Sequence, residues 1–141
     1  MIFFRMLHLS IMVIIISFSL YGFQSNDEKE ILKTLYKQLE AGNKEDLYGY
    51  LETIDSKSQG YSQVKSQLQK LFSIYDLRTQ CENIKVLSIK NGVASVRVTT
   101  TTRKISGPEF ANNRTVTINK LRKVQGKWKL FDTKYLKFER L

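Results

Sequence analysis

The side chains able to do chemistry in this 141-residue chain are mostly carboxylates and phenols, because histidine is nearly absent. The single histidine, His8, lies in an apolar N-terminal stretch, so a domain without that stretch has no Ser–His–Asp, Cys–His or histidine acid–base chemistry. Zinc and non-haem iron sites also lack their usual ligands, since Cys81 is the only cysteine. The glycines are scattered and form no phosphate-binding loop. We therefore expect no metal and no cofactor.

A carboxylate working with a phenol is the catalytic chemistry that remains. Asp132 could act as a base if burial raised its pKa, with Asn119 and Thr117 beside it on the same sheet face. A tyrosine would then donate a hydrogen bond to a developing oxyanion. The tyrosines considered for this role are Tyr36, Tyr50 and Tyr75. Two other roles stay open for Asp132: it orients a ligand, or it only bonds a neighbouring strand or a lysine.

Helical spacing of apolar residues dominates the part of the chain that would position these groups. Residues 26–43 form one apolar stripe, with Asn26 or Asp27 as the expected cap and Gly42 as the stop. A short helix is expected over 44–54 after a cap at Asn43, and a third over 62–77 after a cap at Ser62. The stripes are Ile31, Leu32, Leu35, Tyr36 and Leu39; Leu47, Tyr50, Leu51 and Ile54; and Val64, Leu68, Leu71, Phe72 and Tyr75.

The hydrophobic period changes to two after residue 80, which is typical of strands. Asn91-Gly92 in KVLSIKNGVASVRVTTTT predicts a two-residue hairpin turn, and Gln125-Gly126 predicts a second hairpin joining RTVTINKLRKV to GKWKLFDTKYLKFERL. Counting back from the first turn pairs Ile89 with Ala94, Leu87 with Val96 and Lys85 with Val98 on the core face.

Counting from the second turn assigns the last two strands to opposite faces of the sheet. Trp128 and Leu130 share a face with Leu121, followed by Asn119, Asp132 and Thr117. The opposite face carries Val116, Ile118, Phe131 and Tyr135, mixed with lysines and an arginine. Helices can cover only one face, so we expect another copy of the protein or a partner to cover this second, apolar row.

Three helices followed by a long, bent four-stranded antiparallel sheet resemble the nuclear transport factor 2-like superfamily, which is also described as cystatin-like. The resemblance covers residues 28–140 and is carried by EILKTLYKQLEAGNKEDLYGYL, QGYSQVKSQLQKLF, NGVASVRVTTTT and VQGKWKLFDT. It implies an α+β cone in which the helices pack in the concave face of the sheet. Such domains include ketosteroid isomerase-like and dehydratase-like enzymes, non-catalytic binding domains and homodimers, so the fold does not specify a function.

The resemblance also implies a pocket between the helices and the sheet. No catalytic motif matches, so we favour a binding or interaction domain over an enzyme acting on a small apolar ligand. The expected lining residues are Tyr36, Tyr50, Phe72, Tyr75, Thr117, Asn119, Trp128, Leu130 and Asp132.

The first 25 residues differ from the rest of the chain. A short start with Arg5 is followed by a nearly continuous apolar run, and no acid precedes Asp27. This pattern predicts a secretory signal peptide over 1–25 and one domain over 26–141, exported to the periplasm or the cell exterior. An uncleaved anchor of an envelope-assembly module and a buried core helix are the alternatives.

The charge is uneven along the chain. Residues 26–77 carry seven lysines against nine acids, whereas residues 78–141 carry fifteen Lys and Arg against four acids. These cations are expected on both sides of their strands, where they solubilise the domain or contact an anionic surface such as headgroups or an envelope polymer. Nucleic acid is a less favoured partner, since the outer face offers few aromatic residues for base stacking.

Overall fold

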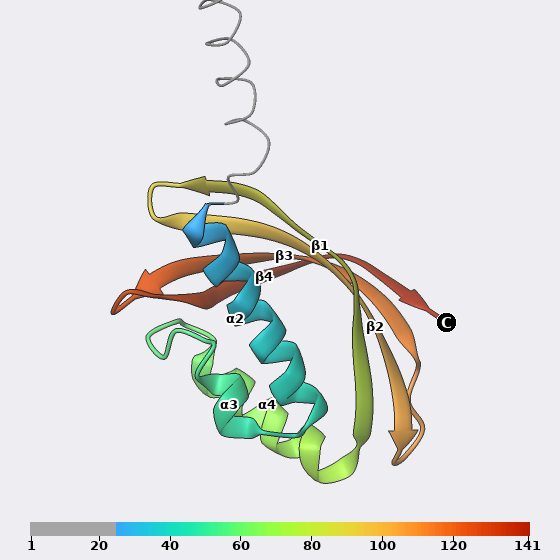
Figure 1. Ribbon diagram of the computed structural model, residues 1–141. Coiled ribbons are helices and arrows are strands. Elements are labelled where there is room, and N and C mark those ends of the chain that lie inside the picture. The colour runs from blue at the N-terminus through green and yellow to red at the C-terminus, as the bar shows by residue number, and fades with distance from the viewer. Residues whose placement is uncertain (1–24) are drawn as a thin grey trace, which may run out of the picture.

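Three helices precede a four-stranded antiparallel sheet in the computed structural model, which describes residues 25–141 (Figure 1). The predicted α+β fold class is confirmed. The expected signal or anchor covers residues 1–25, and all of it except Ser25 lies outside the described part. The elements are α2 (Asn26–Asn43), α3 (Leu47–Leu51), α4 (Tyr61–Ile74), β1 (Asp76–Lys90), β2 (Val93–Ser106), β3 (Asn113–Val124) and β4 (Lys127–Arg140). Between residues 25 and 141, no helix combines the length and the apolar character that crossing a membrane requires.

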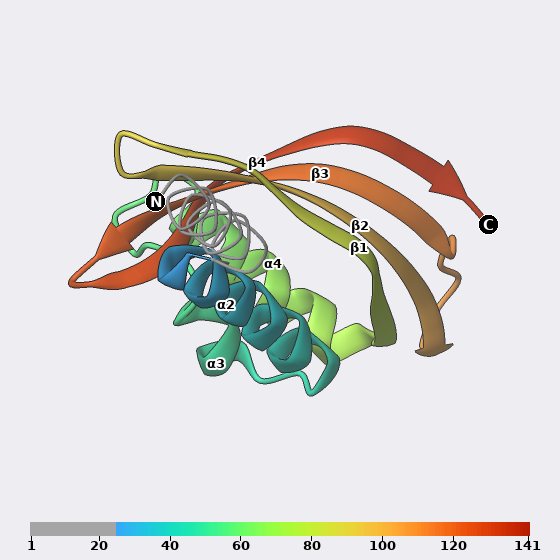
Figure 2. The ribbon, with the colours of Figure 1, turned by 45° about the horizontal axis from the view of Figure 1, so that its top comes forward.

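Helix α2 is the central helix of the fold and packs against the concave side of the sheet (Figure 2). Its N-cap is Ser25, whose hydroxyl accepts a hydrogen bond from the Glu28 N–H, rather than Asn26 or Asp27 as predicted. Ile31 and Leu35 of its apolar stripe are buried against the sheet. Since these two residues lie one turn apart, they fix which side of α2 faces the strands.

Helices α3 and α4 are shorter than their patterns predict. Asp46, not Asn43, caps α3, because the Asp46 carboxylate accepts the Gly49 N–H. The side chain of Asn43 bonds both the N–H and the C=O of Thr79 instead, each at 2.8 Å, and so ties the end of α2 to β1. Helix α4 ends at Ile74, and the chain is already extended by residue 75.

The sheet follows chain order, β1-β2-β3-β4, and both predicted two-residue turns are confirmed. All four turn residues have positive φ, which the twist of a two-residue hairpin favours. The strands contain irregularities that the sequence reading did not include. Four residues are bulges, with no partner of their own between successive paired positions: Glu82 and Leu87 of β1, and Phe131 and Leu136 of β4. Each extra residue reverses the faces of the side chains that follow it.

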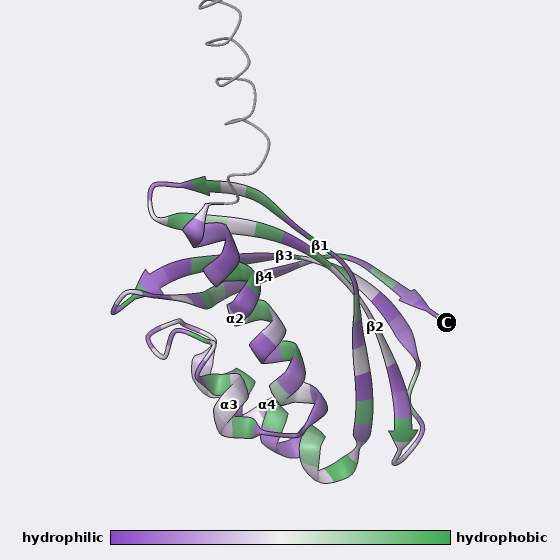
Figure 3. Ribbon diagram, in the orientation of Figure 1, coloured by the Kyte–Doolittle hydropathy of each residue, from purple (hydrophilic) through white to green (hydrophobic). Residues whose placement is uncertain are grey.

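The hydrophobic core lies between α2 and the part of the concave face that is next to the two hairpin turns. Ala94, Val96 and Leu121 are fully buried there, close to Trp128 and Leu130. Of the pairs predicted for this face, Ile89 with Ala94 is confirmed. The other two are wrong, because the bulge at Leu87 pairs Val86 with Val96 and Ile84 with Val98. Hydrophilic and hydrophobic bands alternate along the strands, as two-faced strands require (Figure 3).

Candidate functional site

An open groove with a volume of about 1350 Å³ lies between the concave face of the sheet and helices α2 and α4. A groove of this size exceeds the usual range of small-molecule pockets, which runs from about 300 to 1,000 Å³. Its central lining residues are Leu35, Tyr36, Leu39, Tyr50, Ile54, Val64, Leu68, Leu71, Leu77, Thr79, Cys81, Ile84, Val98, Thr100, Thr102, Thr117, Asn119, Leu130, Thr133 and Tyr135.

The helical wall of the groove is apolar. Val64, Leu68 and Leu71 of α4 line it at helical spacing, yet α4 has no buried residue along its whole length. An amphipathic helix normally buries its apolar stripe in its own domain. Val64 and Leu68 are partly buried against the core, and what remains exposed of the α4 stripe faces the groove between α4 and the sheet.

The concave positions that line the sheet wall of the groove are uncharged, and threonines of all four strands lie there beside apolar residues such as Ile84, Val98 and Leu130. Thr79 and Thr102 share a hydrogen bond of 3.0 Å, and Thr133 donates to Asn119 at 2.8 Å. Asn119 in turn donates to Thr117 at 3.2 Å. A hydroxyl offers one donor and two acceptor sites, so each of these groups keeps capacity for a ligand. The run of four threonines at 99–102 was the signal in the sequence for this wall.

Tyr50 and Tyr135 approach each other across the groove from α3 and β4. Burial, together with a smaller contribution from the nearby Tyr135 phenol, raises the pKa of Tyr50 to about 12. Tyr135 itself is 70% exposed. The sequence reading placed Tyr135 on the outer face, and this is wrong: after the bulge at Phe131, Tyr135 pairs with Thr117 and lies in the groove.

The same bulge changes the position of Asp132. The predicted register pairs Asp132 with Asn119, but the structure pairs Asp132 with Lys120 and Asn119 with Thr133. Asp132 is exposed where the groove opens, and its strand position points to the convex side. The predicted arrangement of a base beside Asn119 and Thr117 is therefore not formed.

Of the other predicted lining residues, Tyr36, Tyr50, Thr117, Asn119 and Leu130 border the groove, whereas Phe72, Tyr75 and Trp128 do not. Tyr75 packs its ring against Phe110, with 5.6 Å between centroids. Trp128 is buried in the core, and its indole N–H donates to the Asp27 carboxylate at 3.0 Å. The sequence reading missed Cys81, Thr133 and Leu68 as lining residues, because it followed an unbroken two-residue period and took the α4 stripe as core.

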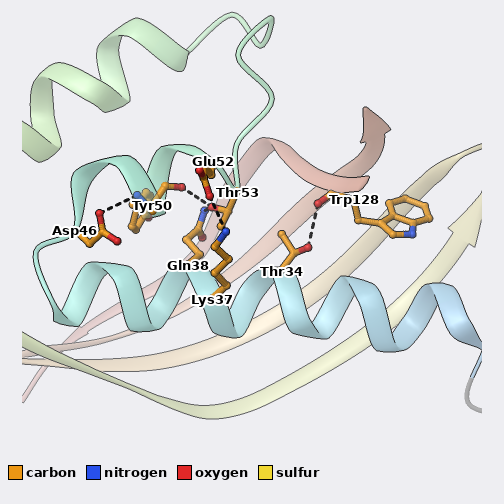
Figure 4. Close-up of polar contacts among 9 residues, drawn as sticks. Thr34, Lys37, Gln38, Asp46, Tyr50, Glu52, Thr53 and Trp128 are labelled. Atoms are coloured by element: carbon orange, nitrogen blue, oxygen red, sulfur yellow. Dashed lines mark hydrogen bonds and ion pairs between the residues drawn. The ribbon is translucent and has the colours of Figure 1, made fainter. Parts of the chain in front are cut away.

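Polar contacts from α2 fix the edge of the groove. Thr34 donates to the Trp128 carbonyl at 3.0 Å, and Gln38 donates to the Thr53 hydroxyl at 2.8 Å (Figure 4). The segment carrying Thr53 adds to the edge of β4: the Asp55 N–H donates to the Leu130 carbonyl, and the Leu130 N–H donates to the Thr53 carbonyl. One face of α2 thus holds both β4 and the chain between α3 and α4 in place.

The convex face differs from the apolar surface predicted for it. Val116 and Ile118 do lie there, but Phe131 sits in a bulge under the Arg122 guanidinium, 4.6 Å from ring centroid to Cζ, and Tyr135 has left this face. Most of the basic residues expected on both sides share this one face. They are Arg78, Lys85, Lys90, Arg97, Arg103, Arg114, Lys120, Arg122, Lys127, Lys129, Lys134 and Lys137. Its acids are Asp76, Glu82, Asp132 and Glu139.

The residues from 25 to 141 contain no group of three or more side chains arranged to hold a metal ion. The one free thiol, Cys81, lines the groove, and partial burial raises its pKa. A protonated thiol is a poor nucleophile, so this pKa direction does not favour a reactive role for Cys81.

Solved structures with a nuclear transport factor 2-like or cystatin-like fold resemble this domain, which confirms the resemblance drawn from the sequence. A cystatin-like protein of unknown function from Nostoc punctiforme has a TM-score of 0.63 and 17% identity, covering 79% of this chain and 91% of that one. A nuclear transport factor 2-like protein of unknown function from Pseudomonas putida has a TM-score of 0.67 and 11% identity, covering 81% and 88%. Similarity at such low identity shows the fold alone.

Residues 33–141 match the family model described as the C-terminal domain of anti-sigma-I factor RsgI9, and the chain belongs to that family. Anti-sigma-I factor RsgI9 of Acetivibrio thermocellus is 32% identical over 99 residues. The match covers 70% of this chain but only 14% of that protein. The family thus identifies this domain with one terminal part of a much longer relative.

Proposed function

We propose that this domain is a non-catalytic binding module whose groove holds an uncharged, amphipathic ligand. The observation that carries the proposal is the α4 stripe of Val64, Leu68 and Leu71, which lines the groove and is only partly buried by the fold. Covering this stripe with a ligand removes apolar surface from water, at about 25 cal/mol for each Å². Ligand sites typically combine such a surface with a few polar groups.

The two walls of the groove define the ligand's chemistry. Apolar side chains of α4 stand opposite the hydroxyls of Thr100, Thr102 and Thr133, so the ligand has one apolar side and one hydrogen-bonding side. The charged lining residues, including Lys57 and Arg122, come from the 57–60 loop and the convex positions rather than from the two walls. A charged ligand would therefore find no counterion on the groove floor.

An isomerase-like or dehydratase-like enzyme is the weaker candidate. It would need a buried carboxylate near a phenol, and Asp132 is exposed opposite Lys120. The hydrogen-bond partners of Asn119 are Thr117 and Thr133, not Asp132. A hydroxyl wall suits the positioning of a ligand better than proton transfer, since serine and threonine hydroxyls need an adjacent base to react.

The family membership supports a recognition role. The relative is named an anti-sigma factor. For this chain we propose only the role of a terminal domain that binds a signal. We also propose export, on the apolar stretch before Asp27. An intact mass beginning between Phe23 and Asp27 would support cleavage, whereas a protein that starts at Met1 and needs detergent would support an anchor.

Self-association through the outer sheet face was expected from the sequence, and the charge on that face disfavours it. Central positions such as Lys85, Arg97 and Lys134 have no ion pair within residues 25–141. Two such faces brought together would place like charges in contact. The same charge keeps an anionic surface as a candidate partner for this face.

Nile red, an uncharged dye that fluoresces in apolar surroundings, tests the groove. We expect the protein as purified to bind it saturably. Leu68→Arg in the helical wall and Thr102→Arg in the sheet wall should each weaken binding, by about tenfold or more. Tyr48→Arg is the matched control, since Tyr48 is 77% exposed and does not border the groove. Unchanged affinity in both groove variants, with folding verified by circular dichroism, would refute the proposal.

A further inference from the structure

The last half of β4 is an open sheet edge. β4 is the terminal strand of the sheet, and the 53–55 segment covers it only around Leu130. From Phe131 to Arg140 its backbone bonds to β3 on one side and to no other described segment on the opposite side. An unpaired edge of this length is a template for another strand. Figure 1 shows this part of β4 running beyond the helices to the C-terminus.

Apolar side chains gather along this edge. Tyr135, Leu136, Phe138 and Leu141 are 70%, 49%, 59% and 55% exposed. Proteins usually protect an exposed edge with proline, a short strand, inward charges, lysines or bulges. The β4 edge does have lysines and bulges, and the pairing proposed below uses both. This strand is 14 residues long, and the only proline of the chain, Pro108, lies outside it. Exposed apolar residues grouped on an unpaired strand indicate a binding surface.

We propose that this edge pairs with the same edge of a second copy, in an antiparallel arrangement with Leu136 opposite Lys137. The strand is self-complementary in this register. Tyr135 lies opposite Phe138 on the concave side, and Lys134 lies opposite Glu139 on the convex side. The bulge at Leu136 makes this possible, because it puts Tyr135 and Phe138 on one face although they are three residues apart.

Charge selects this register over the nearest alternative. Moving the strands by two positions sets Lys134 opposite Lys137 and Asp132 opposite Glu139, and it also sets the concave Tyr135 opposite Leu136. Moving them by one position puts a concave residue opposite a convex one, which an antiparallel pair does not allow. Opposite charges across strands are favourable and like charges directly opposite are unfavourable, so the first register has the lowest energy.

Edge pairing also avoids the repulsion that disfavours face-to-face association. A two-fold axis perpendicular to the sheet places the two concave faces on one side and the two cationic faces on the other. The result is a continuous eight-stranded sheet with one groove in each half. This inference does not depend on what the groove binds.

Sedimentation of the protein as purified tests the pairing by charge reversal. We expect a concentration-dependent dimer that Lys134→Glu weakens about tenfold, that Glu139→Lys also weakens, and that the double reversal restores, because the symmetric interface contains each pair twice. Lys85→Glu is the matched control, since Lys85 shares the convex face but lies on β1. A monomer up to about 1 mM, or equal weakening by Lys85→Glu, would overturn the proposal.

Mixed cross-linking tests the register itself, in a Cys81→Ser background. Tyr135→Cys and Phe138→Cys chains should form a disulfide when mixed, because opposite residues have Cβ atoms about 4.5–5.5 Å apart. Neither variant should cross-link alone, since each cysteine then lies about three residues from its symmetry mate. Cross-linking of either variant alone, or none in the mixture, would contradict this register.

Discussion

The ion pair between Asp55 and Arg122 holds the edge of the sheet together, and its removal has a predictable cost. The Arg122 Nε and Nη2 atoms lie 2.8 and 2.6 Å from one Asp55 carboxylate oxygen. The Asp55 side chain is 3% exposed and the Arg122 side chain 42% exposed. Asp55 also accepts the Lys57 N–H at 2.9 Å. Arg122→Ala would leave a covered carboxylate with one neutral donor.

The expected loss of unfolding free energy in Arg122→Ala lies between two limits. Breaking a fully buried pair costs about 3–5 kcal/mol, whereas an exposed pair contributes about 0–1 kcal/mol. Because Arg122 is 42% exposed and the Lys57 N–H remains, solvent screening reduces the loss to about 2 kcal/mol. Removal of the guanidinium from the Phe131 ring adds about 0.5 kcal/mol. For a domain of this size the melting temperature should fall by about 8–10 °C.

The stability loss caused by Arg122→Ala should change with pH in a definite direction. The Lys57 N–H, followed by Arg122, lowers the pKa of Asp55 below its ordinary 3.8. A lowered folded-state pKa contributes stability that is present above pH 3.8 and is lost as the pH falls through the folded value. The difference in unfolding free energy between wild type and Arg122→Ala should therefore narrow below about pH 3.5.

Urea unfolding of four proteins completes the test: wild type, Arg122→Ala, Asp55→Asn and the double variant. Arg122→Ala should cost less in the Asp55→Asn background, because no charge is then left without its partner. Lys120→Ala on the same strand and face is the control. A loss below about 0.5 kcal/mol, or one that is equal at pH 3 and pH 7, would refute the reasoning.

Two further predictions follow from the backbone and from burial. Gly107 has φ of 119°, and a Cβ there would lie 2.8 Å from the Ile74 carbonyl oxygen, so Gly107→Ala should cost about 2–3 kcal/mol in urea unfolding. Gly60→Ala, with no atom within 4 Å of its Cβ, should stay within about 0.5 kcal/mol; equal losses would contradict the clash. Tyr50 has a pKa raised from 10.0 to about 12, so stability should fall as the pH rises through that interval. Absorbance titration should lose its highest step in Tyr50→Phe, and an unchanged curve would disprove the assignment.

The helices, both hairpin turns and the fold were predictable, because each depends on local signals of fixed spacing. Asn91-Gly92 and Gln125-Gly126 adopt the positive φ angles that a two-residue turn needs. Helix boundaries were less predictable. Asn43 looked like a cap from its sequence position, yet its side chain bonds Thr79, 36 residues away. No local pattern reveals a partner that only the tertiary fold supplies.

The faces of the strands were not predictable by strict alternation, because bulges break the two-residue period. In β1 the concave apolar residues are Ile84, Val86 and Ile89, at steps of two and then three. The step of three marks the bulge at Leu87. A reading that allowed it would have placed all three on the core face and left Lys85 outside.

Strand β4 also contains steps of three. These bulges determine which of its residues face the groove and which lie on the convex side of the open edge. Its concave residues are Trp128, Leu130, Thr133, Tyr135, Phe138 and Arg140, at steps of two, three, two, three and two. The first step of three moves Asp132 out of the groove and brings Thr133 in, so the groove loses a carboxylate and gains a hydroxyl.

The second step of three, at Leu136, acts on the edge of the sheet. It puts Phe138 on the concave face and Lys137 and Glu139 on the convex face. Without it, Glu139 would share the concave face with Tyr135, and Lys134 of a second copy would have no opposite charge to pair with. The two bulges therefore determine, within one strand, both the neutral chemistry of the groove and the self-complementarity of the edge.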